Sequence, residues 1–222
     1  MTTIELLSPE AHGHLRLRAP DAQTPHFVQI LSAEFTTAAA CCPILLTKEA
    51  ATGAFYAGAM FGFKPGENLL GEAKDRGGFE PLILRRGGFF MSGENIAIDR
   101  AHARFSDHEG EPLFDELRQP GKSLRAIQRT LGEIHAGLEL TREFIKTLSL
   151  LRLIEPIDIS IGAGPARLSL QGLYTVSLDR LRDLDDAEVL RLFRAGYLQL
   201  VYVMATSLKH IGRLAALRPQ GP

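Results

Sequence analysis

The 222-residue sequence has no tryptophan, only two cysteines and no excess of either charge. Its two cysteines, Cys41 and Cys42, are neighbours, and neighbouring residues rarely form a disulfide with each other. No CxxC motif and no Cys/His ligand spacing is present. These shortages argue against a disulfide framework and against a Cys/His zinc site. They predict a protein of a reducing compartment in which both cysteines are small, buried packing residues.

The balance of charge and the shortness of the apolar runs exclude further classes. Lys and Arg number 25 against 26 Asp and Glu, and the two signs are mixed along the chain, so no basic field for nucleic acid exists. The longest uncharged run near the C-terminus, residues 195–208, spans about fourteen residues, whereas a membrane helix needs about twenty. The first twenty residues lack the long apolar stretch of a secretory signal. We therefore expect a cytoplasmic protein without a membrane span.

The first half of the chain is organised around residues 43–70. An apolar run at 44–46 meets a turn that ends in Gly53, and an apolar-aromatic run at 55–63 stops at the turn Lys64-Pro65-Gly66. Two such runs with Gly and Pro at the breaks predict a β-hairpin. Around it, we expect an edge strand at 14–18, a short helix capped by Ser32, and further strands at 80–91 and 93–99.

In the second half of the chain, the spacing of the apolar residues changes to that of a helix. Leu124, Ile127, Leu131, Ile134 and Leu138 step by three and four, which predicts an amphipathic helix from about 123 to 153. Alternation at 157–161 and 166–176 around a turn at 162–165 predicts a second hairpin. A short helix at 178–184 and a nearly all-apolar helix from about 185 to 208 follow, and Asp185 and Glu188 have the spacing of a capping box at the start of the second. We expect this second helix to be central to the core.

These elements predict an α+β fold: antiparallel hairpins packed with a long amphipathic helix and an apolar C-terminal helix. We expect residues 1–26 to form a flexible arm or edge strand, 27–214 a single domain with a connector at 99–123 between two halves, and 215–222 a disordered tail.

Segment 99–116 carries the densest polar chemistry of the chain. Its candidate residues for a ligand or partner are Asp99, Arg104, Ser106, Glu111, Phe114 and Asp115. A divalent metal is an alternative, with ligands from Asp99, His102, Asp107, His108, Glu109 and Glu111, although their spacing is not a recognised ligand pattern. The plainer interpretation is a docking loop, because Leu113 and Phe114 lie between carboxylates and indicate an apolar anchor.

Gln171 and Tyr174 are the remaining candidates for ligand binding, because Gly172 between them indicates a bulge or a close backbone approach in the second hairpin. Core packing is the competing interpretation of Tyr174. No set of residues has the spacing of a catalytic constellation, and the glycine-rich steps at 87–88 and 162–164 lack a phosphate-binding context. We therefore name no catalytic residues, no metal and no cofactor.

Four separated blocks resemble one family, in the family's order and over about residues 27–212. They are ILSAEFTTAAACCPILLTKEAATGAFYAGAMFGFKPGENLL (30–70), IDRAHARFSDHEGEPLFDE (98–116), SLQGLYTVSLDRLRDLDD (169–186) and LFRAGYLQLVYVMATSL (192–208). The chain is similar in these blocks to SapC-like bacterial proteins. It departs from them at Cys42, where relatives more usually carry an aromatic residue before the proline.

The resemblance implies a context rather than a reaction. The family takes its name from a protein linked to a bacterial surface layer, its activity is unassigned, and relatives are often encoded near outer-membrane receptors for nutrient uptake, flavin-dependent halogenases and cupin-like oxygenases. We therefore expect a non-catalytic accessory protein of an uptake or modification system that binds a protein partner or a small molecule. The alternatives are a metal-dependent enzyme using residues 99–116 and a surface-layer component.

Overall fold

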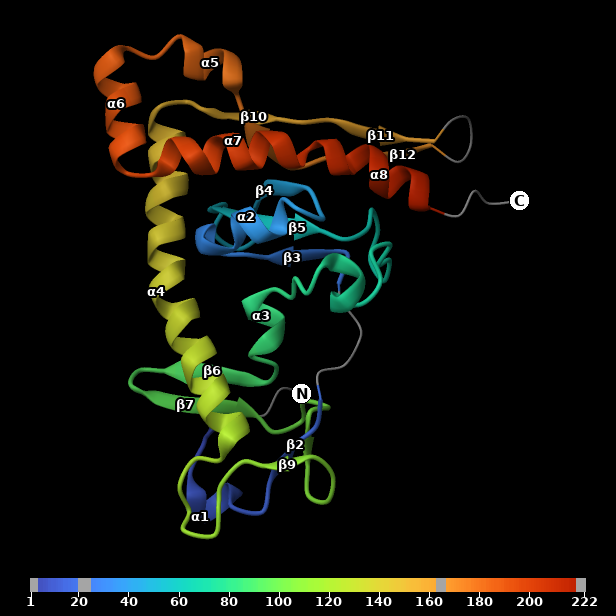
Figure 1. The fold of residues 1–222 in the computed structure, drawn as a ribbon, viewed down its shortest axis with the longest axis vertical. Helices are drawn as coiled ribbons and strands as arrows, with labels where there is room; N and C mark the ends of the chain where they lie inside the picture. Colours follow the sequence, from blue (N-terminus) through green and yellow to red (C-terminus); the bar gives the residue numbers. More distant parts are fainter. Residues whose placement is uncertain (1–3, 20–24, 163–166, 219–222) are drawn as a thin grey trace. The chain divides into compact units, whose positions relative to one another are not determined.

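The computed structural model describes residues 4–19, 25–162 and 167–218 (Figure 1). The backbone forms two compact units built from interleaved segments: unit 1 is Met1–Gln23 with Leu82–Ala136, and unit 2 is Thr24–Pro81 with Gly137–Pro222. The predicted connector at 99–123 lies inside unit 1 rather than at a passage between units. The domain limits at 26/27 and 214/215 stay a prediction.

Unit 1 contains two small antiparallel sheets. One has the order β1-β7-β6 and the other β8-β2-β9. The strands are β1 (Ile4–Leu6), β2 (Arg16–Leu17), β6 (Phe89–Ser92), β7 (Asn95–Asp99), β8 (Phe105–Ser106) and β9 (Glu111–Pro112), and the short helices are α1 (Pro9–His12) and α3 (Leu82–Arg85). A buried cluster joins them to the first turns of the long helix through Leu15, Leu17, Phe89, Ile98, Phe105, Leu113, Phe114, Leu124, Ile127 and Leu131.

Two expectations for unit 1 were wrong. Strand β2 is central and not an edge, because it pairs with β8 on one side and β9 on the other, and both partners come from the segment 99–116. Residues 80–91 are not strand throughout, because 82–85 form α3 and only the end belongs to β6. Gly87 separates the two with φ +56°, and a left-handed residue at that point prevents a continuous strand.

Unit 2 is built on a five-stranded antiparallel sheet with the order β10-β13-β4-β5-β3. Its strands are β3 (Phe27–Gln29), β4 (Ile44–Lys48), β5 (Phe55–Met60), β10 (Ile154–Pro156) and β13 (Leu173–Val176). The hairpin predicted at 43–70 is β4–β5. The second predicted hairpin is present as β11 (Ile159–Ile161) paired with β12 (Leu168–Leu170), and residues 163–165 of its predicted turn lie outside the described residues. Its predicted second strand, 166–176, is not continuous, because Gly172 has φ +75° and residues 173–176 form β13 of the five-stranded sheet.

The long helix α4 (Lys122–Leu150) is confirmed and runs without interruption through both of its glycines. The short helix before β4 is also present, as η1 (Ser32–Glu34) followed by α2 (Phe35–Ala38). Ser32 does not cap it. The cap comes instead from the Glu34 carboxylate, which accepts a hydrogen bond from the backbone amide of Leu31 at 2.8 Å. A 3-10 turn, η2 (Ala73–Arg76), follows β5 in unit 2.

The single apolar helix predicted at 185–208 is divided in the structure. It consists of α6 (Asp186–Arg194) and α7 (Tyr197–Ser207), preceded by α5 (Leu178–Arg182) and followed by α8 (Lys209–Leu217). Gly196, with φ +74°, separates α6 from α7. Asp185 caps α6 as its spacing to Glu188 predicted, and their side-chain to amide distance is 2.8 Å. Because α8 extends to Leu217, part of the predicted tail is helical, and residues 219–222 lie outside the described residues.

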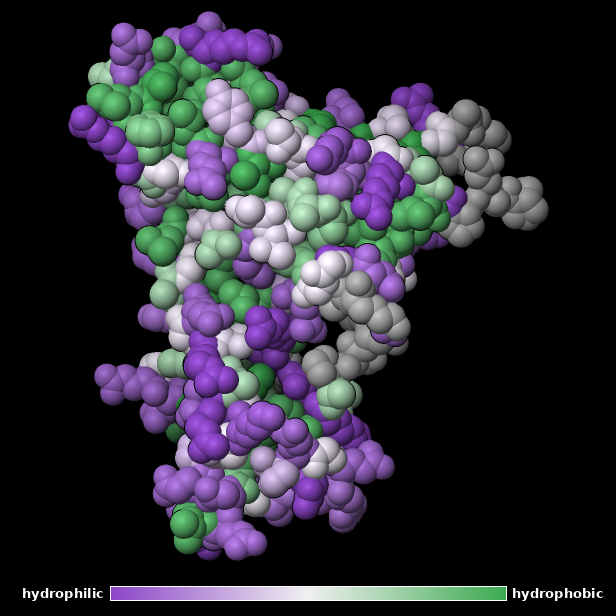
Figure 2. Space-filling model, in the orientation of Figure 1, coloured by the Kyte–Doolittle hydropathy of each residue, from purple (hydrophilic) through white to green (hydrophobic). Residues whose placement is uncertain are grey.

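Only one face of the C-terminal helices is part of the core. Helix α7 packs against β4, β13 and α2, and its residues Val201, Met204 and Ser207 are buried. Its opposite face is open, since Tyr202 is 50% exposed, and Phe193 of α6 is 66% exposed. Figure 2 shows hydrophobic residues at the surface around α5 and α6. The α+β class is confirmed, and α7 contributes one face to the core while its opposite face is exposed.

No helix within the described ranges combines the length and the apolar character that crossing a bilayer requires.

Candidate functional site

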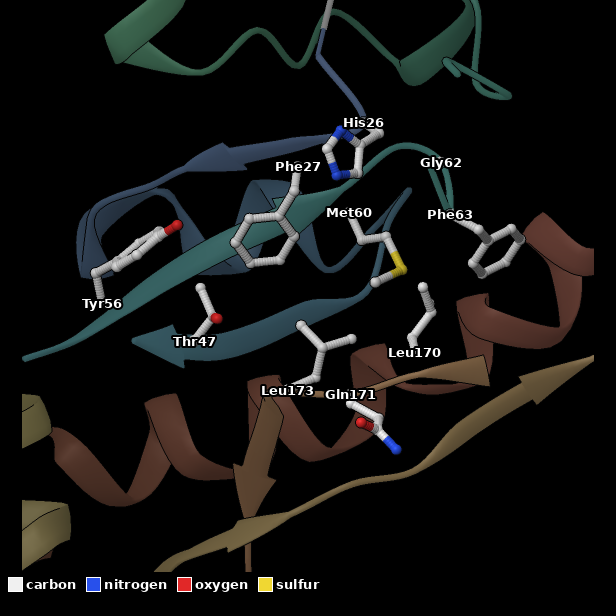
Figure 3. Close-up of a pocket in the computed structure, with 10 residues that line it drawn as sticks. All are labelled: His26, Phe27, Thr47, Tyr56, Met60, Gly62, Phe63, Leu170, Gln171 and Leu173. Carbon is white, nitrogen blue, oxygen red and sulfur yellow. The ribbon is translucent and has the colours of Figure 1, made fainter. Parts of the chain in front are cut away.

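A pocket of about 310 Å³ lies over the sheet of unit 2 (Figure 3). We call it the sheet pocket. It is lined by His26, Phe27, Thr47, Tyr56, Met60, Gly62, Phe63, Leu170, Gln171 and Leu173. These residues come from strand β3 and the residue before it, from the β4–β5 hairpin and the turn that follows it, and from the stretch between the end of β12 and the start of β13.

The strand register explains why these side chains meet. Thr47 is the direct cross-strand partner of both Tyr56 and Leu173, and Phe27 is the partner of Met60. Directly opposed residues of an antiparallel pair project to the same face of the sheet. The pocket therefore occupies one face of β3, β5, β4 and β13.

A glycine in β5 makes room for the aromatic wall of the pocket. A Cβ on Gly58 would lie 2.2 Å from the ring of Phe27, so the ring fills the space above the glycine. The Phe27 ring also packs edge-to-face with Tyr56, with 6.2 Å between ring centroids. Phe27 can hold this position only while residue 58 has no side chain.

Three polar groups that line the pocket have no hydrogen-bond partner among the described residues. Among the described residues, no hydrogen bond reaches the imidazole of His26, the amide of Gln171 or the hydroxyl of Tyr56. Burial, followed by the charge of Glu49, raises the pKa of the Tyr56 phenol, so this group stays an uncharged donor. Thr47 differs, because its hydroxyl donates to the backbone carbonyl of Gly172 at 2.9 Å. The pocket thus offers hydrogen-bonding groups for a bound molecule.

A second pocket, of about 710 Å³, borders helix α4 and has a different character. It is lined by Gln29, Lys48, Glu49, Ala50, Ala54, Phe55, Tyr56, Leu138, Thr141, Arg142 and Ile145. Three of these residues carry charge, Lys48, Glu49 and Arg142, whereas none of the residues lining the sheet pocket is Lys, Arg, Asp or Glu. Tyr56 belongs to both pockets.

Six of the predicted site residues belong to unit 1, and none of them is among the residues that line the two pockets. Arg104 is 8% exposed, and its guanidinium donates to the backbone carbonyls of Arg18 and Arg85 at 3.2 and 3.0 Å. The hydroxyl of Ser106 accepts from the side chain of Arg18 at 3.3 Å and from two following backbone amides. These two residues tie the loop to its neighbours.

The carboxylates among the predicted site residues also bond within unit 1. Asp99 accepts from the amide of Ala101 at 3.2 Å, and Glu111 accepts from the hydroxyl of Ser123. Asp115 accepts from the amides two and four residues farther along, at 3.0 and 2.8 Å, as in an Asx turn. Each of these contacts stabilises the local backbone.

Phe114 belongs to the core of unit 1. Its side chain is 7% exposed and that of Leu113 is fully buried. This is the arrangement expected of a docking loop. Nearby, Asp107 pairs with Arg100 at 2.7 Å and Glu109 with Arg18 at 3.1 Å. Within the described part of the chain, no three His, Cys, Asp or Glu side chains form a group that could hold a metal ion.

The two predicted site residues of unit 2 have different surroundings. Gln171 lines the sheet pocket. Tyr174 packs edge-to-face against Phe55, with 4.9 Å between ring centroids, and the ammonium of Lys48 lies 5.4 Å from its ring. Tyr174 is thus placed in an aromatic contact rather than in the pocket lining.

The sequence interpretation missed nine of the ten residues that line the sheet pocket, since it named only Gln171. Most of them lie in runs that it interpreted as strands, and His26 lies in the segment 1–26 that it interpreted as a flexible arm or edge strand. One signal was available in β5: Gly58 interrupts an apolar strand, and a glycine there often marks a close approach.

Comparison with known proteins identifies the family of the chain. Searches of curated proteins and of solved structures each returned no significant match. The sequence profile of the SapC family matches residues 7–214, which include most of each unit and all residues that line the two pockets. The chain therefore belongs to the SapC family.

Proposed function

We propose that this protein is a non-catalytic accessory protein of a bacterial nutrient-uptake or modification system, and that it binds a small molecule in the sheet pocket. The observation that carries the proposal is the combination of apolar walls with three polar groups that have no protein partner among the described residues. Small-molecule sites typically have this composition, and the smallest of them have volumes of about 300 Å³. The cytoplasm is the compartment we propose.

The contacts made by segment 99–116 favour the sheet pocket over a binding site in unit 1. Its predicted ligand residues accept or donate hydrogen bonds to neighbouring protein groups, and Phe114 anchors it in the core. Residues that hold a loop in place lose those contacts when they bind a ligand instead. Among the described residues, His26, Gln171 and Tyr56 of the sheet pocket make no side-chain hydrogen bond that a ligand would have to break. No particular observation favours a metal-dependent enzyme or a surface-layer component.

Capture from host metabolites tests the proposal. Protein is incubated with the small-molecule fraction of its native host, re-isolated by size exclusion and extracted for mass spectrometry. Leu173→Trp fills the sheet pocket, and Leu140→Trp is a matched control because Leu140 is 64% exposed on α4. We expect one compound, chemically unchanged, with the wild type and the Leu140 variant, and none with the Leu173 variant. Equal capture by all three, or conversion of the compound, would contradict the proposal.

A further inference from the structure

We infer that the ligand of the sheet pocket is a small, uncharged, planar aromatic molecule that carries one hydrogen-bonding group; this inference rests on the proposed function. Three observations define this class: the charge of the lining, the aromatic side chains and the polar groups that lack described partners.

The charge of the lining selects against ions. None of the ten residues is Lys, Arg, Asp or Glu, and a buried ion without an opposite charge or sufficient hydrogen bonds is strongly disfavoured. The neighbouring pocket along α4 shows the contrast, because Lys48, Glu49 and Arg142 line it. A bound ion would find a side chain of opposite charge in the pocket along α4. The lining of the sheet pocket contains no Lys, Arg, Asp or Glu that could serve in this way.

The aromatic side chains select for an aromatic ring. Phe27, Tyr56 and Phe63 line the pocket, and Met60 adds a polarisable thioether. Aromatic rings prefer offset or edge-to-face neighbours, and sulfur also contacts rings favourably. Tyr56 packs beside the Phe27 ring, and the ring fills the space that is left because Gly58 has no side chain. A saturated molecule of equal size gains only the apolar contact.

The polar groups select for a hydrogen-bonding substituent. The imidazole of His26 and the amide of Gln171 lie on opposite sides of the pocket in Figure 3, and the imidazole accepts or donates according to its tautomer. A purely hydrocarbon ligand would remove these groups from water without replacing the lost hydrogen bonds. The pocket volume of about 310 Å³ suits a bicyclic molecule and not a large cofactor.

Four probes of similar size test the class: 2-naphthol, decahydro-2-naphthol, naphthalene and 2-naphthoate. They differ in planarity, in the polar group and in charge. The protein has no tryptophan, so naphthyl fluorescence is read without indole emission, and calorimetry measures the saturated probe. We expect 2-naphthol to bind about tenfold more tightly than decahydro-2-naphthol or 2-naphthoate, and several-fold more tightly than naphthalene.

Two variants locate the binding. Gly58→Ala displaces the Phe27 ring and should weaken 2-naphthol binding about tenfold. His26→Ala removes a side chain that is half-buried at the pocket and should weaken 2-naphthol severalfold while leaving naphthalene unchanged. The second variant keeps the test valid if the first does not fold.

The outcomes separate the ligand class from the binding function. Equal affinity for 2-naphthol and decahydro-2-naphthol, or tighter binding of 2-naphthoate, would overturn the aromatic, uncharged class while the pocket remains a binding site. Failure of every probe to bind the wild type would also overturn the class, and capture of a host compound blocked by Leu173→Trp would then still support the proposed function. Binding of 2-naphthol that both variants leave unchanged would place it outside the sheet pocket.

Discussion

The buried hydroxyl of Ser207 in α7 accepts a hydrogen bond from the backbone amide of Ile44 in β4 at 2.9 Å. The same hydroxyl donates to the carbonyl of Met204 at 2.6 Å. One side chain thus joins the C-terminal helix to a central strand more than 160 residues away.

Ser207→Ala should destabilise unit 2 by about 1–3 kcal/mol, because it leaves the buried amide of Ile44 without its acceptor. Thr206→Ala is the matched control, since the exposed Thr206 hydroxyl donates to the carbonyls of Tyr202 and Val203 in its own helix. Urea unfolding of both variants measures the difference. Equal midpoints would show that the Ser207 bond contributes nothing.

Met204→Asp should prevent folding, because an unpaired carboxylate in a fully buried position costs several kcal/mol against a total stability of about 5–15 kcal/mol. Tyr202→Asp should fold, since Tyr202 is 50% exposed on the opposite face of the same helix. Soluble yield and thermal melts check both variants. A normal melt for Met204→Asp would contradict the placement of this face in the core.

The two glycines of α4 should respond in opposite ways to alanine. Gly132→Ala should stabilise the protein by about 0.5–1 kcal/mol, because Gly132 is exposed and a Cβ there meets no atom within 4 Å. Gly137→Ala should bring no such gain, because its Cβ would lie 2.7 Å from Cδ1 of Leu31. Denaturant midpoints decide, and an equal gain for both would refute the close contact at Gly137.

Phe114→Ala should destabilise unit 1 by about 3–5 kcal/mol, as expected for the loss of a buried phenyl ring. Leu117→Ala, a few residues farther along, should have almost no effect because Leu117 is 81% exposed. The combined variant Asp99→Asn, Glu111→Gln and Asp115→Asn should capture the host compound at the wild-type level. Loss of capture would return segment 99–116 to the binding site.

Cys41 should react with iodoacetamide before Cys42. Their sulfurs lie 3.8 Å apart, and the hydrogen bond between them lowers the pKa of Cys41 and raises that of Cys42, which burial raises further. The positive charge of Arg76 also favours the Cys41 thiolate. The thiolate is the reactive form, so as the pH is raised we expect the first adduct on Cys41, located by tandem mass spectrometry.

Unfolding in urea provides the control for this experiment, because both thiols should then react at similar rates. Faster modification of Cys42 in the folded protein would contradict the assignment. The double change to alanine should leave the fold intact, since it removes one sulfur atom at each position and breaks no disulfide.

Local patterns were enough to predict several elements. The apolar stripe of α4, the β4–β5 hairpin and the cap of Asp185 on α6 depend on residues close together in the sequence. Their physical causes, periodicity, turn residues and a side-chain cap, act within a few residues of each other. These predictions were confirmed for that reason.

The sheet pocket could not be predicted in the same way. Phe27, Thr47, Tyr56 and Leu173 come from four strands, and only the register that pairs them places their side chains on one face. Likewise, the central place of β2 depends on pairing with a segment about ninety residues away. The polarity of segment 99–116 drew attention to residues that hold a loop in place.

The sequence by itself determined the family, through the blocks that resemble it and the profile match over residues 7–214. It also determined the α+β class and the long helix, because these follow from periodicity along single stretches of chain. Tertiary structure alone decided which face of α7 is buried, and it decided where the polar groups of His26 and Gln171 meet an apolar wall. Those features depend on which strands pair and on whether a glycine such as Gly58 lies beneath an aromatic ring. Such contacts join residues distant in sequence, and no local pattern encodes them.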